Sequence, residues 1–320
     1  MEPTHKNRPS PLEKVVPTLS YLGLVYAASG FFNEVYIARL WPRWHIDSIF
    51  LSRFSEIFVI VGFGLYRLRV EKNAYTRRRI LALILFMASL WGVIPLFFPF
   101  HEPHVGLVPF SIEFPGVHVP GALTYFVWLT LIFFFGRRVD CGWCCPCVGI
   151  RETAGAPFRK ATIKGGTAWR LRHIQWIFAA FHVIYLVLIF LPSHPFAATF
   201  FTLFWTIIPL GYYVSFLVIP WTGNRNFCRY LCPFGSVYGA VSVAGFYRID
   251  ANPALCHQCG RCDRDCDMGV PVSVLVREKG VINDSSCTGC GRCVSGCPNR
   301  VLSFRDVRDV FRRDDESKQR

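Results

Sequence analysis

Long runs without a formal charge constrain this chain more than any other feature. Residues 80–100 form an uncharged run of 21 residues, residues 114–136 one of 23, and residues 173–224 one of 52. A helix that crosses a membrane needs about 20 mostly apolar residues. Each of the first two runs therefore fits one span, and the third fits two, joined at the turn formed by residues 192–195.

Two further apolar segments precede these runs and bring the predicted number of spans to six. Residues 15–33 are uncharged, and residues 48–66 have spanning length but contain Arg53 and Glu56, which we expect to pair with each other. Because 52% of the residues are hydrophobic and only 18% are charged, against about 25% in soluble proteins, the composition also favours a membrane protein. The first 14 residues do not resemble a cleaved signal peptide, so we expect the N-terminus to be retained.

The basic residues are distributed unevenly over this six-span arrangement. The formal net charge is +14, and 32 of the 35 Lys and Arg residues fall on the side that carries both termini. Loops rich in Lys and Arg stay on the cytoplasmic side of a membrane. We therefore predict a protein of the bacterial inner membrane with both termini in the cytoplasm. The charge then reflects topology, and no nucleic-acid partner is expected.

The eight C-terminal cysteines follow the spacing of bacterial ferredoxins that hold two 4Fe-4S clusters. Residues 256–266 read C-x2-C-x2-C-x3-C, and residues 287–298 repeat this pattern with a proline at the end. In such runs three cysteines bind one cluster and the fourth binds the other. The predicted ligands are Cys256, Cys259, Cys262 and Cys297 for cluster I, and Cys287, Cys290, Cys293 and Cys266 for cluster II.

Zinc is the alternative occupant of these cysteines, since C-x2-C pairs also suit a tetrahedral zinc ion. Eight cysteines in this doubled order favour iron-sulfur clusters instead. One residue departs from the ferredoxin pattern, because Asp267 stands where the first run would have a proline, and Pro271 comes four residues later. We therefore expect cluster I to lie in a locally altered loop while keeping its four ligands.

A second cysteine motif occurs twice in the membrane part. Residues 136–146 and 223–233 both read G-x-R-x-x-C-x3-C-P, each after a predicted span, which indicates two related helix-pair units. If each motif begins a helix, its two thiols share one face. The four thiols would then meet at the membrane edge and hold a third iron-sulfur centre, a copper or zinc ion or a redox-active disulfide, unless they are only structural. These residues are Cys141, Cys145, Cys228 and Cys232.

Other residues of the repeat have less certain roles. Cys144 and Cys147 add thiols to the first copy only, and the sequence assigns them no function. Arg138 and Arg225 occupy the same place in the two copies. They either lower the pKa of nearby thiols or extend to lipid headgroups.

Ionisable side chains at membrane depth are functional candidates by default. His182 falls near the middle of the fifth predicted span, and Glu34 follows the first. A quinone headgroup needs a hydrogen-bond donor and a proton acceptor, which His182 or Glu34 could supply. The alternative is a hydrogen bond between helices. Haem is disfavoured because no other span offers a histidine at comparable depth as a second axial ligand.

In combination these motifs resemble the NapH/NosR/CcoG-type membrane polyferredoxins. The resemblance rests on C-G-W-x-C-P at residues 141–146, on C-R-Y-L-C-P-F-G at residues 228–235 and on the doubled ferredoxin run, and it covers roughly residues 121–306. It implies electron transfer between the quinone pool and a redox partner, with the ferredoxin domain in the cytoplasm. NapH-like members resemble a four-span core, whereas six spans are predicted here. The flavin-binding domain of the NosR-like branch and the immunoglobulin-like domain of the CcoG-like branch are not expected, so the chain resembles a minimal NapH-like module.

We therefore expect an all-α polytopic membrane protein with a C-terminal α+β two-cluster ferredoxin domain. The expected parts are a cytoplasmic tail (1–14), a transmembrane domain (15–245), a ferredoxin-like domain (246–306) and a charged tail (307–320). The expected function is that of an iron-sulfur electron-transfer subunit of a quinol dehydrogenase complex, with lipid, quinone and other redox subunits as partners. The rival hypothesis is an assembly factor that binds or reduces copper through the C-x3-C-P thiols. A redox sensor that signals through a partner is a third.

Overall fold

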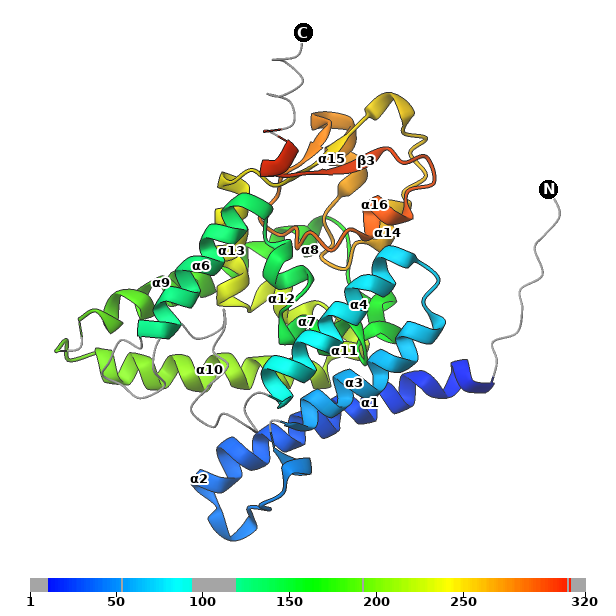
Figure 1. Ribbon diagram of the computed structural model, residues 1–320. Coiled ribbons are helices and arrows are strands. Elements are labelled where there is room, and N and C mark those ends of the chain that lie inside the picture. The colour runs from blue at the N-terminus through cyan, green and yellow to red at the C-terminus, as the bar shows by residue number, and fades with distance from the viewer. Residues whose placement is uncertain (1–10, 53, 94–118, 192, 310, 312–320) are drawn as a thin grey trace.

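The described part of the chain consists of a helical body and a small C-terminal module (Figure 1). The computed structural model describes residues 11–52, 54–93, 119–191, 193–309 and 311. The helices of the body are α1 (Pro11–Phe32), α2 (Ala38–Leu40), α3 (Phe54–Val70), α4 (Ala74–Phe86), α6 (Val119–Phe135), α7 (Pro146–Glu152), α8 (Gly166–Leu171), α9 (Gln175–Ile189), α10 (Ala197–Leu217), α11 (Ile219–Thr222), α12 (Asn226–Tyr230) and α13 (Pro233–Ala244).

Each of the six predicted spans contains a helix, but these helices differ in length. Within the described residues, three helical stretches are long and apolar enough to cross a membrane, namely Lys14–Ile37, Gly166–Leu188 and Ala197–Leu217. They correspond to the first, fifth and sixth predicted spans. The apolar stretch of α6, Tyr125–Phe135, is shorter. The end of the third predicted span and the start of the fourth fall within residues 94–118, outside the described part of the chain.

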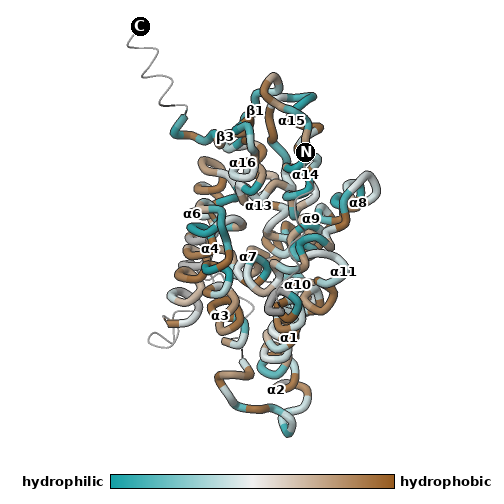
Figure 2. The backbone as a smooth tube through the Cα atoms, turned by 90° about the vertical axis from the view of Figure 1, so that its right-hand side faces the viewer, coloured by the Kyte–Doolittle hydropathy of each residue, from teal (hydrophilic) through white to brown (hydrophobic). Residues whose placement is uncertain are grey.

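Apolar side chains cover the outside of the helical body as well as its core. Phe126 on α6 is 56% exposed and Ile177 on α9 is 69% exposed, while Leu24, Ile60 and Phe216 are completely buried between helices. In Figure 2 the hydrophobic residues run along the helices, and the hydrophilic ones gather toward the C-terminal module. Because a soluble monomer rarely exposes large contiguous apolar surfaces, this distribution is that of a protein whose helices contact lipid.

The helices of the body pack in two connected groups. Helix α1 lies against α3 and α10, and α3 in turn contacts α4 and α7. On the other side, α9 contacts α10 and α13, and α6 contacts α13. The short helices α7, α12 and α13, which carry the two C-x3-C-P motifs, thus lie between the long helices and the module.

The two C-x3-C-P motifs do not begin helices, so the condition under which each pair of thiols would share one helix face is not met. In the first copy a π-helical turn, Arg138–Gly142, ends before the motif does, and α7 starts only at Pro146; in the second, α12 ends and α13 starts at Pro233. Proline favours the first helical position and forces the residue before it out of the helical conformation. Cys145 and Cys232 are therefore extended N-cap residues.

The two copies nevertheless have the same backbone geometry. Gly136 and Gly223 begin them with φ of +83° and +85°, a region that residues with a Cβ rarely adopt. In both copies the backbone N–H of the second cysteine donates to the carbonyl oxygen five residues earlier, at 3.0 Å. The repeat seen in the sequence is thus a repeated turn in three dimensions.

The C-terminal module is a three-stranded antiparallel sheet with three short helices. Strand β1 (Arg248–Ala251) lies between β2 (Val281–Ile282) and β3 (Leu302–Arg305). The helices are α14 (Arg261–Asp265), α15 (Val272–Lys279) and α16 (Arg292–Gly296). Gly260 and Gly291 precede α14 and α16 in the left-handed conformation, which lets each cysteine loop turn sharply into its helix.

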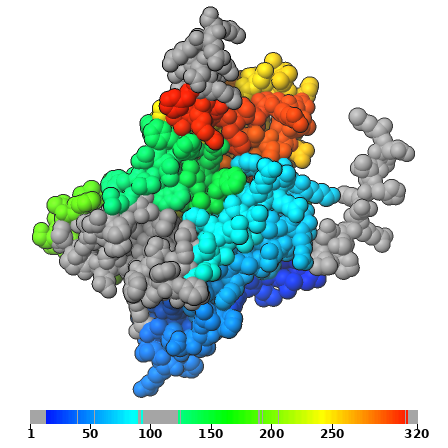
Figure 3. Space-filling view, viewed as in Figure 1, coloured from blue at the N-terminus to red at the C-terminus, as the bar shows by residue number. Residues whose placement is uncertain are grey.

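The module packs directly on the helical body (Figure 3). The backbone N–H of Phe246 donates to the carbonyl oxygen of Phe133 at 3.0 Å, and the Arg137 side chain donates to the carbonyl oxygen of Ser285 at 2.9 Å. Gly239 on α13 lies so close to Ser285 that a Cβ would collide with its carbonyl group. These contacts fix the ferredoxin-like module on the body.

Candidate functional site

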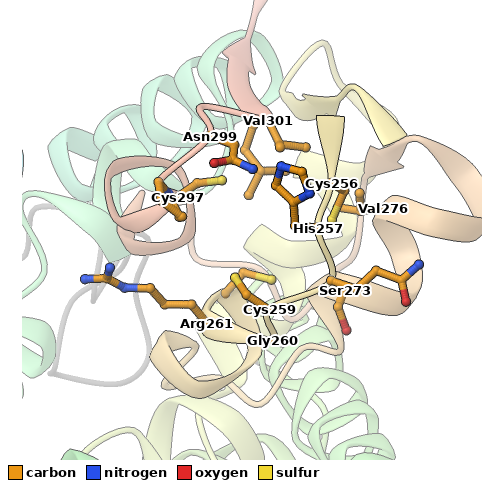
Figure 4. A pocket seen from close by; sticks show the side chains of 14 residues that line it. Cys256, His257, Cys259, Gly260, Arg261, Ser273, Val276, Cys297, Asn299 and Val301 are labelled. Carbon is orange, nitrogen blue, oxygen red and sulfur yellow. The ribbon is translucent and has the colours of Figure 1, made fainter. Parts of the chain in front are cut away.

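The four thiols predicted for cluster I surround one cavity of the module. A cavity of about 100 Å³ is lined by Cys256, Cys259, Cys262 and Cys297. In Figure 4, Cys256, Cys259 and Cys297 point toward this common space, while the Arg261 side chain points away from it. Of the 14 cysteines, all of which lie in the described part of the chain, Cys259 alone is exposed. The cluster I cavity therefore opens to solvent beside Cys259.

The four thiols predicted for cluster II surround a second, smaller cavity. It has a volume of about 30 Å³ and is lined by Cys266, Cys287, Cys290 and Cys293. Its wall also includes Arg225, Asp267 and Arg292, which belong to the interface with the helical body. The fold thus brings the eight thiols together in the two predicted groups of four, and their role as cluster ligands stays a prediction.

The cluster II cavity also offers backbone donors to its sulfur atoms. Burial raises the pKa of Cys266 and of Cys287 to about 12, so both are protonated at neutral pH before they bind iron. Backbone N–H groups of Val270 and Gly289 donate to these two sulfurs. Metal binding must then release protons, and N–H donors to cysteine sulfur tune the potential of a bound cluster. The residues present therefore fit 4Fe-4S clusters.

The C-x3-C-P thiols come together around a buried arginine, Arg137. Its Nε donates to Cys141 Sγ at 3.2 Å. Burial lowers the pKa of Arg137, but the thiols of Cys141, Cys232 and Cys228 outweigh this and raise its pKa overall. Burial raises the pKa of the Cys141 and Cys232 thiols, and the nearby Cys145 thiol raises both further. The four thiols therefore lie within electrostatic reach of one another and form one group. A buried guanidinium needs an anionic partner, and these thiols can supply one when they are ionised or bind metal.

Two additional thiols lie next to this group. Cys147 is buried, and its thiol shares a hydrogen bond with that of Cys145; Cys144 is half-buried. In the described part of the chain, no three His, Cys, Asp or Glu side chains are close enough to hold a single metal ion. A four-iron cluster differs in this respect, because it binds each thiolate through a different iron atom.

Neither arginine of the repeat extends to lipid, so that interpretation of the sequence is wrong. The Arg138 guanidinium binds the Asp306 carboxylate, and Arg225, which is 2% exposed, binds Glu152 at 2.6 Å. Both partners come from segments distant in sequence. The two arginines therefore join parts of the fold, and Arg225 also lies within electrostatic reach of Cys228 and Cys290.

Glu152 is the centre of a buried ion-pair network that joins the module to the body. Its carboxylate binds Arg79 at 2.7 Å, Arg225 at 2.6 Å and also Arg292, and it is completely buried. Burial alone would raise the pKa of Glu152, but Arg292, Arg79 and Arg225 hold it well below its usual range. Because Arg292 neighbours Cys293, this network connects α4, α7 and the residue before α12 with the cluster II loop.

Asp267, the residue that departs from the ferredoxin pattern, makes a second contact between module and body. Its carboxylate accepts three hydrogen bonds of 2.8–3.0 Å from Arg159, and it lies 3.8 Å from Arg292. Asp267 lines the cluster II cavity. The expectation that this substitution alters the cluster I loop is therefore wrong, because the residue after Cys266 faces the other cavity and the helical body.

We predict that Asp267→Ala weakens the attachment of the module. Asp267 is 4% exposed, and hydrogen bonds to charged groups contribute about 1.5–3 kcal/mol, so the free energy of unfolding should fall by about that amount. Urea unfolding in detergent measures it. In a double-mutant cycle with Arg159→Ala, most of the effect of Asp267→Ala should vanish. Additive effects of the two substitutions would contradict this pairing.

His182 lies in the aromatic core between α6, α9, α10 and α13. It is completely buried, its Nε2 is 3.0 Å from the Tyr125 hydroxyl, and its ring contacts Phe204 and Phe234. Its Nδ1 has no hydrogen-bond partner among the described residues. If Nε2 accepts the Tyr125 proton, Nδ1 carries the ring hydrogen and remains available as a donor.

Glu34 and Glu56 lie elsewhere in the helical body. Glu34 is half-buried in the π-helical segment Asn33–Ile37, within electrostatic reach of Tyr213. Glu56 accepts hydrogen bonds from Tyr212 at 2.5 Å and Tyr213 at 3.0 Å, whereas its predicted partner Arg53 lies outside the described residues.

Sequence reasoning missed the residues that connect the thiol groups. Arg79 and Glu152 lie outside the repeated cysteine pattern, and Arg137 occupies one of its variable positions, where the second copy has Asn224. The charges of the sequence do carry one signal for Glu152. Residues 137–172 contain eight basic residues and two acidic ones, Asp140 and Glu152. An isolated acid in a basic segment is a candidate for ion pairing.

A family of 4Fe-4S dicluster domains matches residues 248–298. This segment begins at the first residue of β1 and contains all eight cysteines of the two cavities. The match covers the C-terminal module alone. It supports iron-sulfur clusters in the module and leaves their number open.

Three curated relatives extend the similarity into the helical body. YccM of Escherichia coli, named for electron transport, is 28% identical over 205 residues, which are 58% of this chain and 56% of YccM. The ferredoxin-type protein NapH of Haemophilus influenzae is 27% identical over 58% of this chain and 70% of NapH, and Escherichia coli NapH is 27% identical over 58% and 69%. This chain thus spans little more than half of YccM. No solved structure matches this chain.

Proposed function

We propose that this chain, which is similar to NapH proteins and to YccM over 58% of its length, exchanges electrons between the quinone pool and a redox partner as the iron-sulfur subunit of a membrane complex. The observation that carries this proposal is the grouping of eight cysteines into two four-thiol cavities on a body whose helices are long and apolar enough to span a membrane. The proposed parts are a helical domain at residues 15–245 and a ferredoxin-like domain at 246–306.

The residues proposed to hold the two clusters are those that line the two cavities. A 4Fe-4S cluster bound there would accept and donate single electrons. Cys256, Cys259, Cys262 and Cys297 would hold the first, and Cys266, Cys287, Cys290 and Cys293 the second. Arg292 and Asp267, which are buried, would fix the loop around the second. The charge distribution supports six spans with both clusters in the cytoplasm.

His182 is our candidate for binding the quinone headgroup. Its Nδ1, which lacks a partner among the described residues, would donate to a quinone oxygen, and Tyr125 would hold the ring in that tautomer. Electrons would then pass from the bundle of α6, α9 and α13 to the C-x3-C-P layer beneath it. Glu34 is the second candidate, as a proton acceptor near the end of the first span.

The test is to add reduced menaquinol and ubiquinol analogues to protein purified anaerobically and to follow cluster absorbance and EPR. We expect at least one quinol to reduce the clusters. His182→Leu should slow this reduction about a hundredfold, which is within the range for loss of a proton-transferring group, while dithionite still reduces the clusters fully. The matched control is His173→Leu, because His173 is exposed just before α9.

Two results would overturn this proposal. If neither quinol reduces the clusters of the unmodified protein and oxidised quinone fails to reoxidise them, quinone is not the substrate. If His182→Leu and His173→Leu behave alike, the quinone site lies elsewhere, with Glu34→Gln as the next variant.

The rival function, copper handling during assembly of a metalloenzyme, would use the C-x3-C-P thiols. Three of these four, Cys141, Cys145 and Cys228, are buried, and metal transfer to a partner requires accessible thiols. Burial beside Arg137 instead favours a resident centre of the electron path. We therefore expect about twelve iron atoms and as many acid-labile sulfides per chain, at four per cluster.

Iron and sulfide analysis of the Cys141→Ala/Cys228→Ala variant checks this expectation. About four iron atoms should be lost, and the EPR signals of the two ferredoxin clusters should remain. A content of about eight iron atoms before and after the substitution, with copper bound only by the unmodified protein, would favour the assembly function.

A further inference from the structure

Resting on the proposed function, we infer that the two clusters have different partners: cluster II exchanges electrons with the membrane part of this chain, and the cluster I rim is the docking site of a soluble electron carrier with an acidic surface. The rim consists of Cys259, Arg261, Arg264 and Arg300. The step is the transfer of one electron from the reduced protein to the oxidised carrier, and no bond forms or breaks.

The cluster II loop lies against the C-x3-C-P layer. Gly142, between the first two motif cysteines, approaches the carbonyl oxygen of Thr288 so closely that a Cβ would lie 3.4 Å from it. The Arg137 side chain, which donates to Cys141, also donates to the carbonyl oxygen of Ser285 and acts on the Cys287 thiol. One buried arginine thus connects the two groups of thiols.

Arg225 makes a second connection between the same two groups. It belongs to the second C-x3-C-P motif, lines the cluster II cavity and lies within electrostatic reach of both Cys228 and Cys290. The Glu152 network fixes Arg225 and Arg292 on this side of the cavity. Cluster II is therefore enclosed between the module and the helical body.

Cluster I faces solvent on the module. Cys259 is exposed, and its neighbours His257 and Gln258 in the same loop are exposed as well. On the opposite edge of the cavity, Pro298 and Asn299 are also exposed. The helical body reaches the neighbouring α14 through Lys164, which donates to the carbonyl oxygens of Asp263 and Arg264, whereas the loop of Cys259 stays exposed.

The charges of the rim determine the kind of carrier. Arg261, Arg264 and Arg300 are exposed, and Arg264 donates to the carbonyl oxygen of Cys259 at 3.0 Å. Two acids, Asp263 and Asp265, lie among these arginines, and the exposed Lys164 donates to the carbonyl oxygen of Asp263 at 2.9 Å. Four cations thus stand against two carboxylates. The rim therefore keeps a positive charge around the exposed thiol, and complementary charge raises the rate of encounter with an acidic protein.

The first experiment measures which cluster solvent can reach. Dysprosium-EDTA is added to the dithionite-reduced, full-length protein, and the microwave power saturation of each cluster signal is recorded. Cys259→Ser and Cys293→Ser, which replace one ligand of each cluster by oxygen, assign the signals. We expect the chelate to speed relaxation of cluster I and to leave cluster II almost unchanged. Equal effects, or a larger effect on cluster II, would overturn the inference.

The second experiment measures docking with oxidised plastocyanin, an acidic one-electron carrier of high potential. Its reduction by the dithionite-reduced protein is followed by stopped-flow at low salt. Arg261→Glu and Arg264→Glu should each slow it about tenfold, and plastocyanin with amidated carboxylates should react slowly with all forms. Arg78→Glu, an equal charge change at an exposed site on α4, is the control.

Each outcome of the docking experiment supports or overturns the inference. The inference would be overturned if both rim variants reduced plastocyanin as fast as Arg78→Glu and the unmodified protein do. Failure of plastocyanin to react at all would also overturn it. Unchanged EPR spectra show that the variants remain folded. Because dithionite supplies the electrons, failure of the quinol reaction would remove the proposed function without affecting this result.

Discussion

Replacing Glu152 by glutamine is expected to lower the free energy of unfolding by about 3–5 kcal/mol, because breaking a buried ion pair leaves an uncompensated charge in the interior. Here three guanidinium groups, those of Arg79, Arg225 and Arg292, would lose their common partner while remaining buried. Urea unfolding in detergent, monitored by cluster absorbance and by tryptophan fluorescence, measures the change.

The same variant should loosen the attachment of the module before the body unfolds. Limited proteolysis is expected to cut between α13 and β1 in Glu152→Gln and to leave the unmodified protein intact. Glu278→Gln removes an equal charge from an exposed position on α15 and should do neither. If Glu152→Gln matched Glu278→Gln in both measurements, the network would contribute nothing to the attachment.

Replacing Cys293 by alanine is expected to remove cluster II and to stop electron flow from quinol to cluster I. The iron content should fall by about four atoms per chain, and the cluster I signal should no longer appear after quinol is added. Dithionite should still reduce cluster I, because that cavity opens to solvent beside Cys259. Iron analysis and EPR after each reductant measure both effects.

Cys144→Ala is the matched control for this substitution. Cys144 lies outside the predicted ligand sets of both clusters, so its loss should change neither the iron content nor the quinol reaction. If Cys293→Ala kept its full iron content, the ligand assignment of cluster II would be wrong. If it lost the iron but quinol still reduced cluster I, electrons would enter the module by another route.

The sequence by itself determined the local features of this protein. Uncharged runs of spanning length predicted membrane helices, because backbone N–H and C=O groups in lipid must form their hydrogen bonds within the helix. The structure contains such helices at α1, α9 and α10. The two cysteine runs predicted which thiols share a cavity, because their spacing places three on one loop and sends the fourth to the other. Both properties depend on residues close together in the chain.

The start of the helices after the C-x3-C-P motifs was also encoded locally, although the sequence analysis left it as a condition. The proline after each second cysteine stops that cysteine from being helical. Pro146 and Pro233 therefore mark the starts of α7 and α13, after the motifs and not at their first cysteines. Here the residue type, and not the periodicity, carried the information.

Only the tertiary structure decided how the thiol groups are connected. Glu152 meets Arg225 across 73 residues of sequence and Arg292 across 140, and Asp267 meets Arg159 across 108. No spacing rule predicts such pairs, because they form only where the packing of distant helices excludes water and leaves each buried charge to find an opposite one. For the same reason, the sequence predicted two clusters, whereas the packing of the module on the body decided that the cluster II cavity faces the helices and the cluster I cavity faces solvent.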